Sequence, residues 1–440
     1  MGIRFAFRSR FHFHPRLNGP WARMAVGVML SASLSSGYTV LTHEAIIDSV
    51  WESSLKKLLL KRFPNSTPEQ LLEAHAYAYG GCIIQDMGYY PFSSRFFSDL
   101  THYVRSGDFI VSLIREAKDL NEFAFAVGAL EHYAADTEGH RIATNRAVPL
   151  LYPKLRQKFG RDVTYWDDPT AHVRTEFGFD VLQVAAGHYA PEGYHDFIGF
   201  HVSKELLERA FENTYGVEMK DVFTSISLAI GSYRYSVSSI IPSMTRVAWS
   251  LKKDELQKHT PGITSRKFRY NLSRASFEKE WGNDYHRPGL CTRLMAFFFR
   301  LLPATGPFSA LKIPTPTPEV EKMFMASFNA TVDRYKILLA SVAADNLTLP
   351  NVNFDAGGPT VSGKYKGTDE AFAKLLDKHA DHKFEAMTPE LRLNILAYYK
   401  NFGADPTKSA KAKVTKESVA ARAKLASQIA QLQAASATTP

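Results

Sequence analysis

The sequence predicts an all-α protein, and two observations support this. Between residues 40 and 250, apolar side chains recur at three- and four-residue steps, which is the period of amphipathic helices. Strand-like alternation and paired hairpin turns are scarce in the same region. The chain has 440 residues, 45% of them hydrophobic, so it can bury a large core and form more than one domain. The clearest helical segments are 42–63, 67–80, 120–140, 201–216 and 222–249.

The first 37 residues have the three parts of an export signal. An arginine-bearing start is followed by the apolar stretch "MAVGVMLSASL" and by the small residues "SSG" before Tyr38. The apolar part is too short to span a bilayer comfortably. We therefore expect a signal peptide over residues 1–37, cleavage after Gly37, and a secreted or periplasmic protein; Met24 is an alternative start.

One helix start is marked by good capping residues. Asn65, Ser66 and Thr67 precede Pro68, and hydroxyl or amide side chains followed by proline are typical of a helix N-terminus. The sequence therefore predicts that this helix begins at about Pro68.

The net charge of +9 is concentrated at the two ends of the chain. Five arginines and no acidic residue lie in the first 37 residues, and residues 408–424 hold six basic residues against Glu417 alone. The remainder is close to neutral. Charge therefore does not support a nucleic-acid groove, and no specific nucleic acid is expected as a partner.

After residue 250 the sequence changes character. We expect a helical domain over 38–250, then a helical extension over 251–345 that contains an apolar hairpin. Such segments usually pack on a core; contact with a membrane surface is the alternative. A Gly-rich linker is predicted at 346–367 and a small helical unit at 368–404, with Thr368 as its N-cap. The basic, Ala/Lys-rich tail at 405–440 is expected to be a frayed helix.

The stretch "GALEHYAADTEGH" places His132, Asp136 and His140 four residues apart. Four residues of a helix advance about 6 Å and turn about 40° past a full revolution, so the three side chains share one face. Imidazole and carboxylate without thiolate suit zinc. An ordinary hydrogen-bonded or solvated helix face is the alternative, and from spacing alone it is the commoner case.

Other segments add residues of the same type. Each is weak alone, because single aspartates often cap turns and single histidines are often structural. His172 and Glu176 lie four residues apart, and a second pair with the same spacing, His201 and Glu205, competes with them. The chain has two cysteines, Cys82 and Cys291, which leaves one disulfide or two free thiols open. The added candidates are His43, Asp86, His102, His172 and Glu176.

The motifs "YTVLTHEAI", "QDMGYYP", "THYV", "FAVGALEHYAADTEGH" and "HVRTEFGFD", taken in order, resemble the zinc-dependent phospholipase C family. The fold of that family is related to the fold of fungal single-strand nucleases. The resemblance covers Tyr38 to about Asp180, and its fourth segment is the most specific. It implies an almost entirely helical domain over 38–250 that holds three zinc ions.

The resemblance also implies which residues hold each ion. One site would consist of Asp86, His102, His132 and Asp136. A second site would consist of His140, His172 and Glu176. The third would consist of His43, Asp136 as a bridge, and the free amine and carbonyl of Tyr38 after cleavage. The family usually has tryptophan at that terminal position.

The function implied is an exported zinc-dependent phosphodiesterase of the phospholipase C type, with Asp86 as ligand and general base. Aromatic residues around the motifs would line a cleft for an apolar or choline-like group, or else belong to the core. One alternative is a zinc-dependent nuclease or phosphomonoesterase of the same fold. Another is a non-catalytic helical binding protein with structural zinc. The aromatic candidates for substrate binding are Tyr79, Tyr89, Tyr90 and Tyr133.

Overall fold

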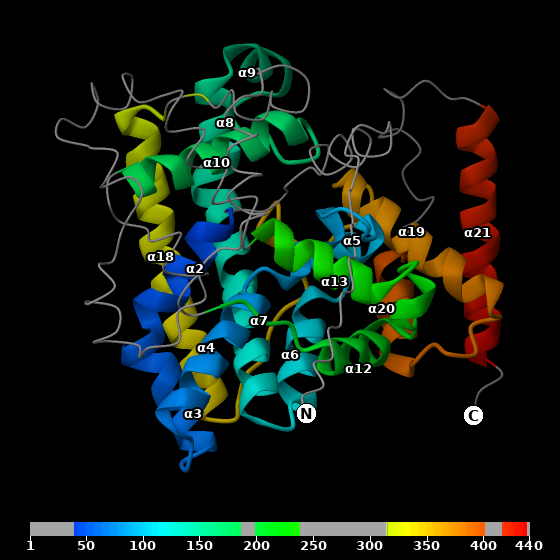
Figure 1. Ribbon diagram of the computed structural model, residues 1–440. Coiled ribbons are helices and arrows are strands. Elements are labelled where there is room, and N and C mark those ends of the chain that lie inside the picture. Colours follow the sequence, from blue (N-terminus) through cyan, green and yellow to red (C-terminus); the bar gives the residue numbers. More distant parts are fainter. Residues whose placement is uncertain (1–38, 186–198, 238–313, 315, 401–415, 438–440) are drawn as a thin grey trace, which may run out of the picture.

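The computed structural model describes residues 39–185, 199–237, 314, 316–400 and 416–437. Within these ranges the chain is helical apart from loops and one short antiparallel pair, in which Val352 faces Pro359 and Asn353 faces Gly358 (Figure 1). The all-α prediction is confirmed. The predicted signal peptide and most of the predicted apolar hairpin lie outside the described residues, as does Cys291. None of the described helices combines the length and apolar character that a membrane crossing requires.

The described helices fall into an N-terminal series that ends with α13 and a later series that begins with α18. The N-terminal ones are α2 (Val40–Val50), α3 (Lys56–Arg62), α4 (Pro68–Gly81), α5 (Arg95–Tyr103), α6 (Ser106–Glu116), α7 (Leu120–Gly139), α8 (Asn145–Leu151), α9 (Pro153–Phe159), α10 (Pro169–Ala185), α12 (Lys204–Tyr215) and α13 (Ile226–Tyr235). The later elements are α18 (Pro318–Ala343), β1 (Val352–Asn353), β2 (Gly358–Pro359), α19 (Lys366–Asp381), α20 (Pro389–Tyr398) and α21 (Lys416–Ala437). Two π-helical turns (Trp51–Leu55 and His140–Thr144) and two 3₁₀ turns (Ile84–Tyr89 and Met219–Asp221) connect neighbouring helices.

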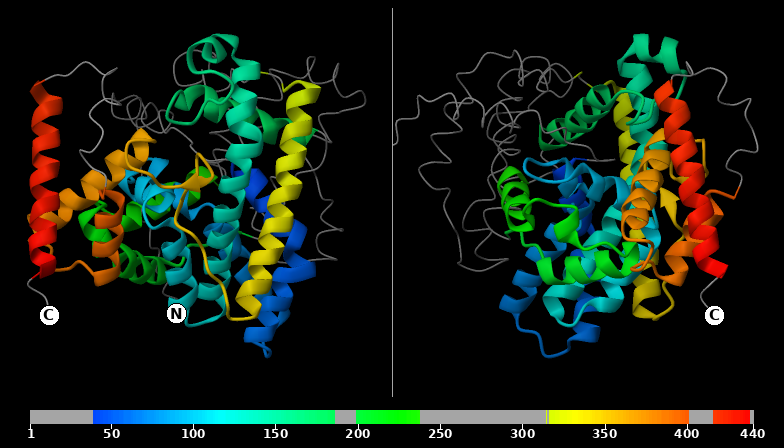
Figure 2. Two further views of the ribbon diagram at one scale, coloured as in Figure 1. Left: turned by 180° about the vertical axis from the view of Figure 1, so that it is seen from behind. Right: turned by 90° about the vertical axis from the view of Figure 1, so that its right-hand side faces the viewer.

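Helix α7 lies at the centre and contacts α2, α3, α4, α6 and α18. The turned views show α18 running beside it (Figure 2). The middle of α7, from Phe123 to Asp136, is buried without interruption. A helix that is buried on all sides can carry polar side chains only where partners satisfy them, so the polar residues of α7 mark a site.

Helix α4 begins as the capping residues predict. Thr67 accepts a hydrogen bond from the backbone N–H of Gln70, whose side chain accepts one from the N–H of Thr67. Pro68 occupies the first turn. This reciprocal capping box satisfies two N–H groups that the helix itself leaves unpaired.

The small unit after α18 forms, but it begins earlier than predicted. Helix α19 starts at Lys366, so Thr368 is inside its first turn and is not the N-cap. The hydroxyl of Thr368 accepts a hydrogen bond from Asn353 instead. Helix α21 is docked rather than frayed, because Leu432 is fully buried and Lys424 pairs with Asp377.

The segment predicted to be a Gly-rich linker, 346–367, packs into the body of the protein. It runs back along α5 and α6 after α18 ends (Figure 2). The Ser106 hydroxyl donates to the carbonyl of Val352 and accepts from its N–H. The side chain of Asn351 accepts from the N–H groups of Gly107 and Asp108. The start of α6 therefore fixes this segment.

Asp180 connects the two helices that carry outlying candidate residues. Its carboxyl on α10 accepts from the backbone N–H of Leu41 at 3.1 Å and from the hydroxyl of Thr42 at 2.6 Å, both at the start of α2. The side chain is fully buried. Burial raises its pKa to about 7, although these hydrogen bonds act in the opposite direction.

The close contact of α4 with α7 gives a first prediction. A Cβ on Gly128 would lie 2.2 Å from the carbonyl oxygen of Ala78, whereas a Cβ on Gly231 would meet nothing within 4 Å. Gly128→Ala should lower the free energy of unfolding by about 1–3 kcal/mol, because backbone must move. Gly231→Ala is the control and should raise it by up to about 1 kcal/mol. Urea unfolding measures both; equal effects would contradict the packing.

A second prediction concerns Asp180 and pH. Its pKa of about 7 lies above the ordinary value of 3.8, so the folded state holds a proton that the unfolded chain releases. This contribution to stability is complete below pH 4 and is lost as pH rises through 7. Asp180→Asn removes the titration, so its free energy of unfolding should fall less steeply across that range. Urea unfolding at several pH values tests this, and parallel profiles for both proteins would refute it.

Candidate metal centre

Asp136 on α7 has four histidines around its carboxylate. The Nε2 atoms of His132, His102 and His140 lie 3.2, 3.4 and 3.6 Å from Oδ2, and the Nε2 of His43 lies 3.7 Å from Oδ1. All five side chains are at most 2% exposed. They come from α2, α5, α7 and the π-helical turn that continues α7. The structure thus brings residues from separate segments to one buried carboxylate.

The first predicted group assembles around Asp86. Its Oδ1 lies 3.3 Å from the Nε2 of His102 and 3.9 Å from the Nε2 of His132. One ligand atom from each of these three residues lies within 4.8 Å of the others. The 3₁₀ turn Ile84–Tyr89 carries Asp86 and helix α5 carries His102. This spacing is compact enough for one ion.

The second predicted group also assembles. One ligand atom each from His140, His172 and Glu176 lies within 4.8 Å of the others. The Nδ1 of His172 is 2.7 Å from Glu176 Oε1, one turn further along α10. The rings of His140 and His172 stack with centroids 4.9 Å apart. The competing His201 is half-buried, its backbone N–H donates to the carbonyl of Ala76, and it belongs to none of the three groups.

The third group is present in the part that the structure describes. His43, His132 and Asp136 have ligand atoms within 4.8 Å of one another, and the rings of the two histidines stack at 4.7 Å. Tyr38, predicted to complete this site with its amine and carbonyl, lies outside the described residues. Its role stays a prediction.

Four of the histidines are oriented by a hydrogen bond on one ring nitrogen. An imidazole that donates from one nitrogen presents a lone pair on the other, which is how metal-binding histidines are usually fixed. The four bonds are His132 Nδ1 to the carbonyl of Cys82 (2.9 Å), His102 Nδ1 to the carbonyl of Ser98 (2.8 Å), His43 Nδ1 to Glu131 Oε2 (3.0 Å) and His172 Nε2 to Asn145 Oδ1 (2.9 Å). The other ring nitrogen of each lies near one of the acidic groups described above.

The buried polar atoms of the site that make no hydrogen bond fit a set of divalent cations. Neither ring nitrogen of His140 makes a hydrogen bond, nor do Asp86 Oδ1 and His172 Nδ1. Buried nitrogen and oxygen atoms without hydrogen bonds are costly unless another partner satisfies them. A dication held by imidazole and carboxylate supplies that partner, and zinc prefers this donor set. The three groups therefore fit zinc by their chemistry as well as their spacing.

Electrostatics within the cluster follow from burial and from these contacts. Burial opposes ionisation of Asp136, but the surrounding histidines hold its pKa well below the usual range. Burial also opposes the charged form of His102, yet contacts with Asp136 and Asp86 raise its pKa to about 10. His43 has a pKa well below the ordinary value because of burial and the neighbouring His132. Burial raises the pKa of Asp86.

Of the four predicted substrate-binding tyrosines, Tyr89 is buried beside the metal residues. The ring of Tyr89 meets His102 edge-on at 6.0 Å. Tyr79 is fully buried and donates to Asp48, and Tyr90 packs edge-on against Tyr233, so both are core residues. Their positions fit the core alternative, and a role of either tyrosine in substrate binding stays a prediction. Tyr133 donates to the carbonyl of Pro350.

Some residues at the site were not predicted. Glu131 orients His43, and Asn145 orients His172. Glu131 directly precedes His132, which was a usable signal on a helix with an otherwise apolar face. Asp355 lies 3.7 Å from His140 through its Oδ1 and comes from the segment predicted as linker. Its sequence neighbourhood, "NFDAGG", carries no recognisable metal-binding pattern.

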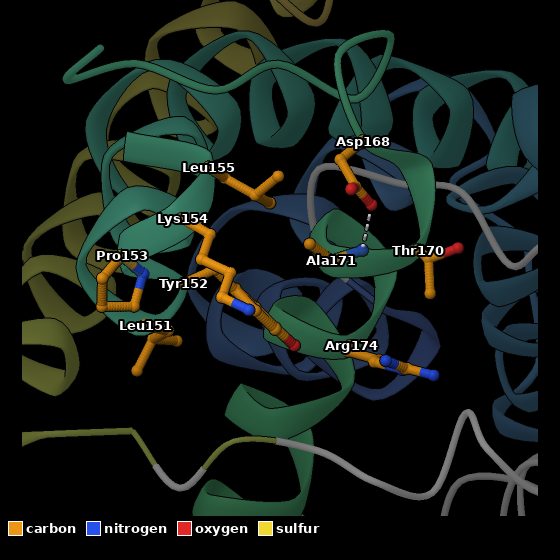
Figure 3. Close-up of a pocket in the computed structure, with 9 residues that line it drawn as sticks. All are labelled: Leu151, Tyr152, Pro153, Lys154, Leu155, Asp168, Thr170, Ala171 and Arg174. Atoms are coloured by element: carbon orange, nitrogen blue, oxygen red, sulfur yellow. Dashed lines mark hydrogen bonds between the residues drawn. The ribbon is translucent and has the colours of Figure 1, made fainter. Parts of the chain in front are cut away.

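A separate pocket of about 530 Å³ lies beside α9 and the start of α10 (Figure 3). Asp168 accepts a hydrogen bond from the N–H of Ala171 at its edge, and Arg174 and Lys154 supply positive charge. None of its lining residues belongs to the metal groups. They are Leu151, Tyr152, Pro153, Lys154, Leu155, Asp168, Thr170, Ala171 and Arg174.

Comparison with known proteins agrees with this geometry. Residues 42–225 match the family model described as zinc dependent phospholipase C, and this range contains every predicted ligand from His43 to Glu176. No curated protein and no solved structure matches the chain significantly. The match confirms the family that the motifs resemble, and with it a zinc-dependent hydrolase of the phospholipase C type in general. Residues 42–225, less than half of the chain, thus match the zinc-dependent phospholipase C family.

Proposed function

We propose that this protein is an exported phosphodiesterase that holds three zinc ions and hydrolyses phospholipids at the glycerol side of the phosphate. The observation that carries the proposal is the convergence of three ligand groups on and beside Asp136, inside a domain of this family. Export would follow from cleavage before Tyr38. That cleavage would also create the free amine that the third group lacks.

The chemistry needs ions close together and a base. Zinc ions bound by these groups would polarise a phosphoryl oxygen and lower the pKa of a water molecule. Asp86 is the residue that best fits the base, because its Oδ1 has no hydrogen bond and its carboxyl lies beside His102 and His132.

The hydrogen bonds behind the ligands would hold the imidazoles in place during turnover. Glu131, Cys82 and Ser98 accept from three of the histidines, so each ring presents a fixed nitrogen to the centre. Fixed donors need little reorganisation when charge develops on the phosphoryl oxygens. The edge of Tyr89 beside His102 is the aromatic surface best placed for a substrate group.

A zinc-dependent nuclease or phosphomonoesterase of the same fold is the second candidate. It would use the same ions and the same base, so the ligand geometry favours neither substrate. Outside its two basic ends the chain is close to neutral, and long nucleic acid requires a positive surface. That observation favours the phospholipid. A helical binding protein with structural zinc would keep the metals and would hydrolyse neither phospholipids nor the other phosphoesters.

Metal content is the first test. The secreted protein, purified without chelator, should contain about three zinc ions per chain and begin at Tyr38 by N-terminal sequencing. Asp136→Asn should lose more than one equivalent, because its carboxylate contacts histidines of all three groups. Glu205→Gln, at the exposed member of the competing pair, is the matched control and should retain all the zinc of the wild-type protein. A zinc-free wild-type protein would remove both enzyme candidates.

Activity assays separate the remaining candidates. Asp86→Asn should lower kcat/KM on phosphatidylcholine vesicles by about 10²–10⁴-fold, the usual contribution of a general base. The same enzyme is assayed on single-stranded DNA and on a phosphomonoester. If the enzyme cleaves single-stranded DNA or the phosphomonoester and leaves phosphatidylcholine intact, the second candidate is favoured. Zinc-loaded protein that is inert toward every phosphoester would favour the non-catalytic role.

A further inference from the structure

The segment after α18 enters the metal centre from outside the part of the chain that matches the family. Residues 42–225 carry the match, whereas Phe354 and Asp355 follow α18 and β1. The N–H of Phe354 donates to the carbonyl of His102 at 3.2 Å. Its ring lies edge-on to the His102 ring at 5.2 Å and tilted to the His132 ring at 6.1 Å. A segment from the C-terminal region thus packs against two predicted ligands.

Asp355 is held in this segment with its two carboxylate oxygens in different surroundings. Oδ2 accepts hydrogen bonds from the hydroxyl of Tyr103, at 2.7 Å, and from the hydroxyl of Tyr365. Oδ1 lies 3.7 Å from the Nε2 of His140. The side chain is 2% exposed. One oxygen is therefore fixed by two donors, and the other is aimed at a histidine of the second metal group.

The contact between Asp355 and His140 has the wrong length for a hydrogen bond and a suitable length for two ligands of one ion. Hydrogen bonds of this kind fall between about 2.7 and 3.2 Å. Two atoms that each lie about 2.0 Å from a tetrahedral zinc are about 3.3 Å apart. The observed 3.7 Å is close to that spacing. Neither ring nitrogen of His140 has a hydrogen bond, and its Nε2 lies 3.6 Å from Asp136 Oδ2 as well as 3.7 Å from Asp355 Oδ1.

Asn145 ties the same segment to a second ligand. Its Nδ2 donates to the backbone carbonyl of Asp355 at 2.6 Å, and its Oδ1 faces the Nε2 of His172 at 2.9 Å. One amide thus fixes the position of Asp355 relative to His172. The carboxylate and the second metal group are therefore parts of one connected arrangement.

We propose that Asp355 is a ligand of the ion held by His140, His172 and Glu176, with Oδ1 as its coordinating atom. This inference rests on the metal binding proposed above. It adds a fourth protein ligand, from a segment outside the family match, to a group of three. Four protein ligands are typical of closed zinc sites, and three leave an open position. With Asp355, the second group would have the four protein ligands of a closed zinc site.

The test measures metal in the full-length protein. Asp355→Asn keeps size and shape and removes the negative ligand, and the control Asp345→Asn makes the same change at an exposed position after α18. Asp355→Asn should lose about one zinc equivalent, or release one equivalent to a chelator at least about tenfold faster than wild type. Zinc content and release rates equal to those of Asp345→Asn would overturn the proposal.

A second variant separates ligation from simple packing. Tyr365→Phe removes one hydrogen bond to Oδ2 and leaves the carboxylate in place. If Asp355 only anchors the segment, both variants should lower the melting temperature and neither should change zinc content. If it is a ligand, only Asp355→Asn should alter zinc content and the visible absorption spectrum of the cobalt-substituted protein.

A measurement on the wild-type protein covers the case in which Asp355→Asn fails to fold. Anomalous diffraction from zinc-loaded crystals should place an ion within about 2.2 Å of Asp355 Oδ1. A zinc ion beside His140 that lies beyond 3 Å from that atom overturns the proposal. A wild-type protein that binds no zinc would instead contradict the proposed function, so the two failures are distinguishable.

Discussion

The buried carboxylate of Asp136 is the constraint on which the rest of the structure depends. An ionised group without solvent is very costly unless opposite charge and hydrogen-bond donors surround it. Four histidine nitrogens within 3.2–3.7 Å meet that requirement here, and the pKa of Asp136 is held well below its usual range despite burial. Because the histidines come from different segments, α2, α5 and the end of α7 must meet at this point for the core to form.

Main-chain atoms at helix ends supply part of the orientation. Cys82 is the C-cap of α4, where carbonyl groups have no partner within the helix, and its carbonyl accepts from His132. The close approach of α4 to α7 through Gly128 brings that helix end beside the ligands. The packing of two apolar helices and the tautomer of a metal-binding imidazole are thus set by the same contact. A change in the packing distance would alter the direction of the ring.

The sequence predicts the parts of the site in which the residues lie close together along one helix. His132, Asp136 and His140 share one face because a helix fixes the angle between residues four apart, and His172 and Glu176 repeat the case on α10. The outlying ligands followed from the order of family motifs, not from geometry. Tyr79 and Tyr90 show the limit of this reasoning: both side chains are buried, and position next to a motif does not distinguish a substrate-binding tyrosine from a core residue.

Contacts between residues far apart in the sequence account for the parts of the site that could not be predicted. Asn145 and the carbonyl of Asp355 are 210 positions apart, and no periodicity connects them. Glycines in the 346–367 segment suggested a flexible linker, yet Ser106 and Asn351 fix it to α6 before it reaches the histidines. A ligand that binds only the folded arrangement stabilises every contact that the arrangement requires. If Asp355 binds zinc as proposed, metal binding and the docking of this C-terminal segment would stabilise each other.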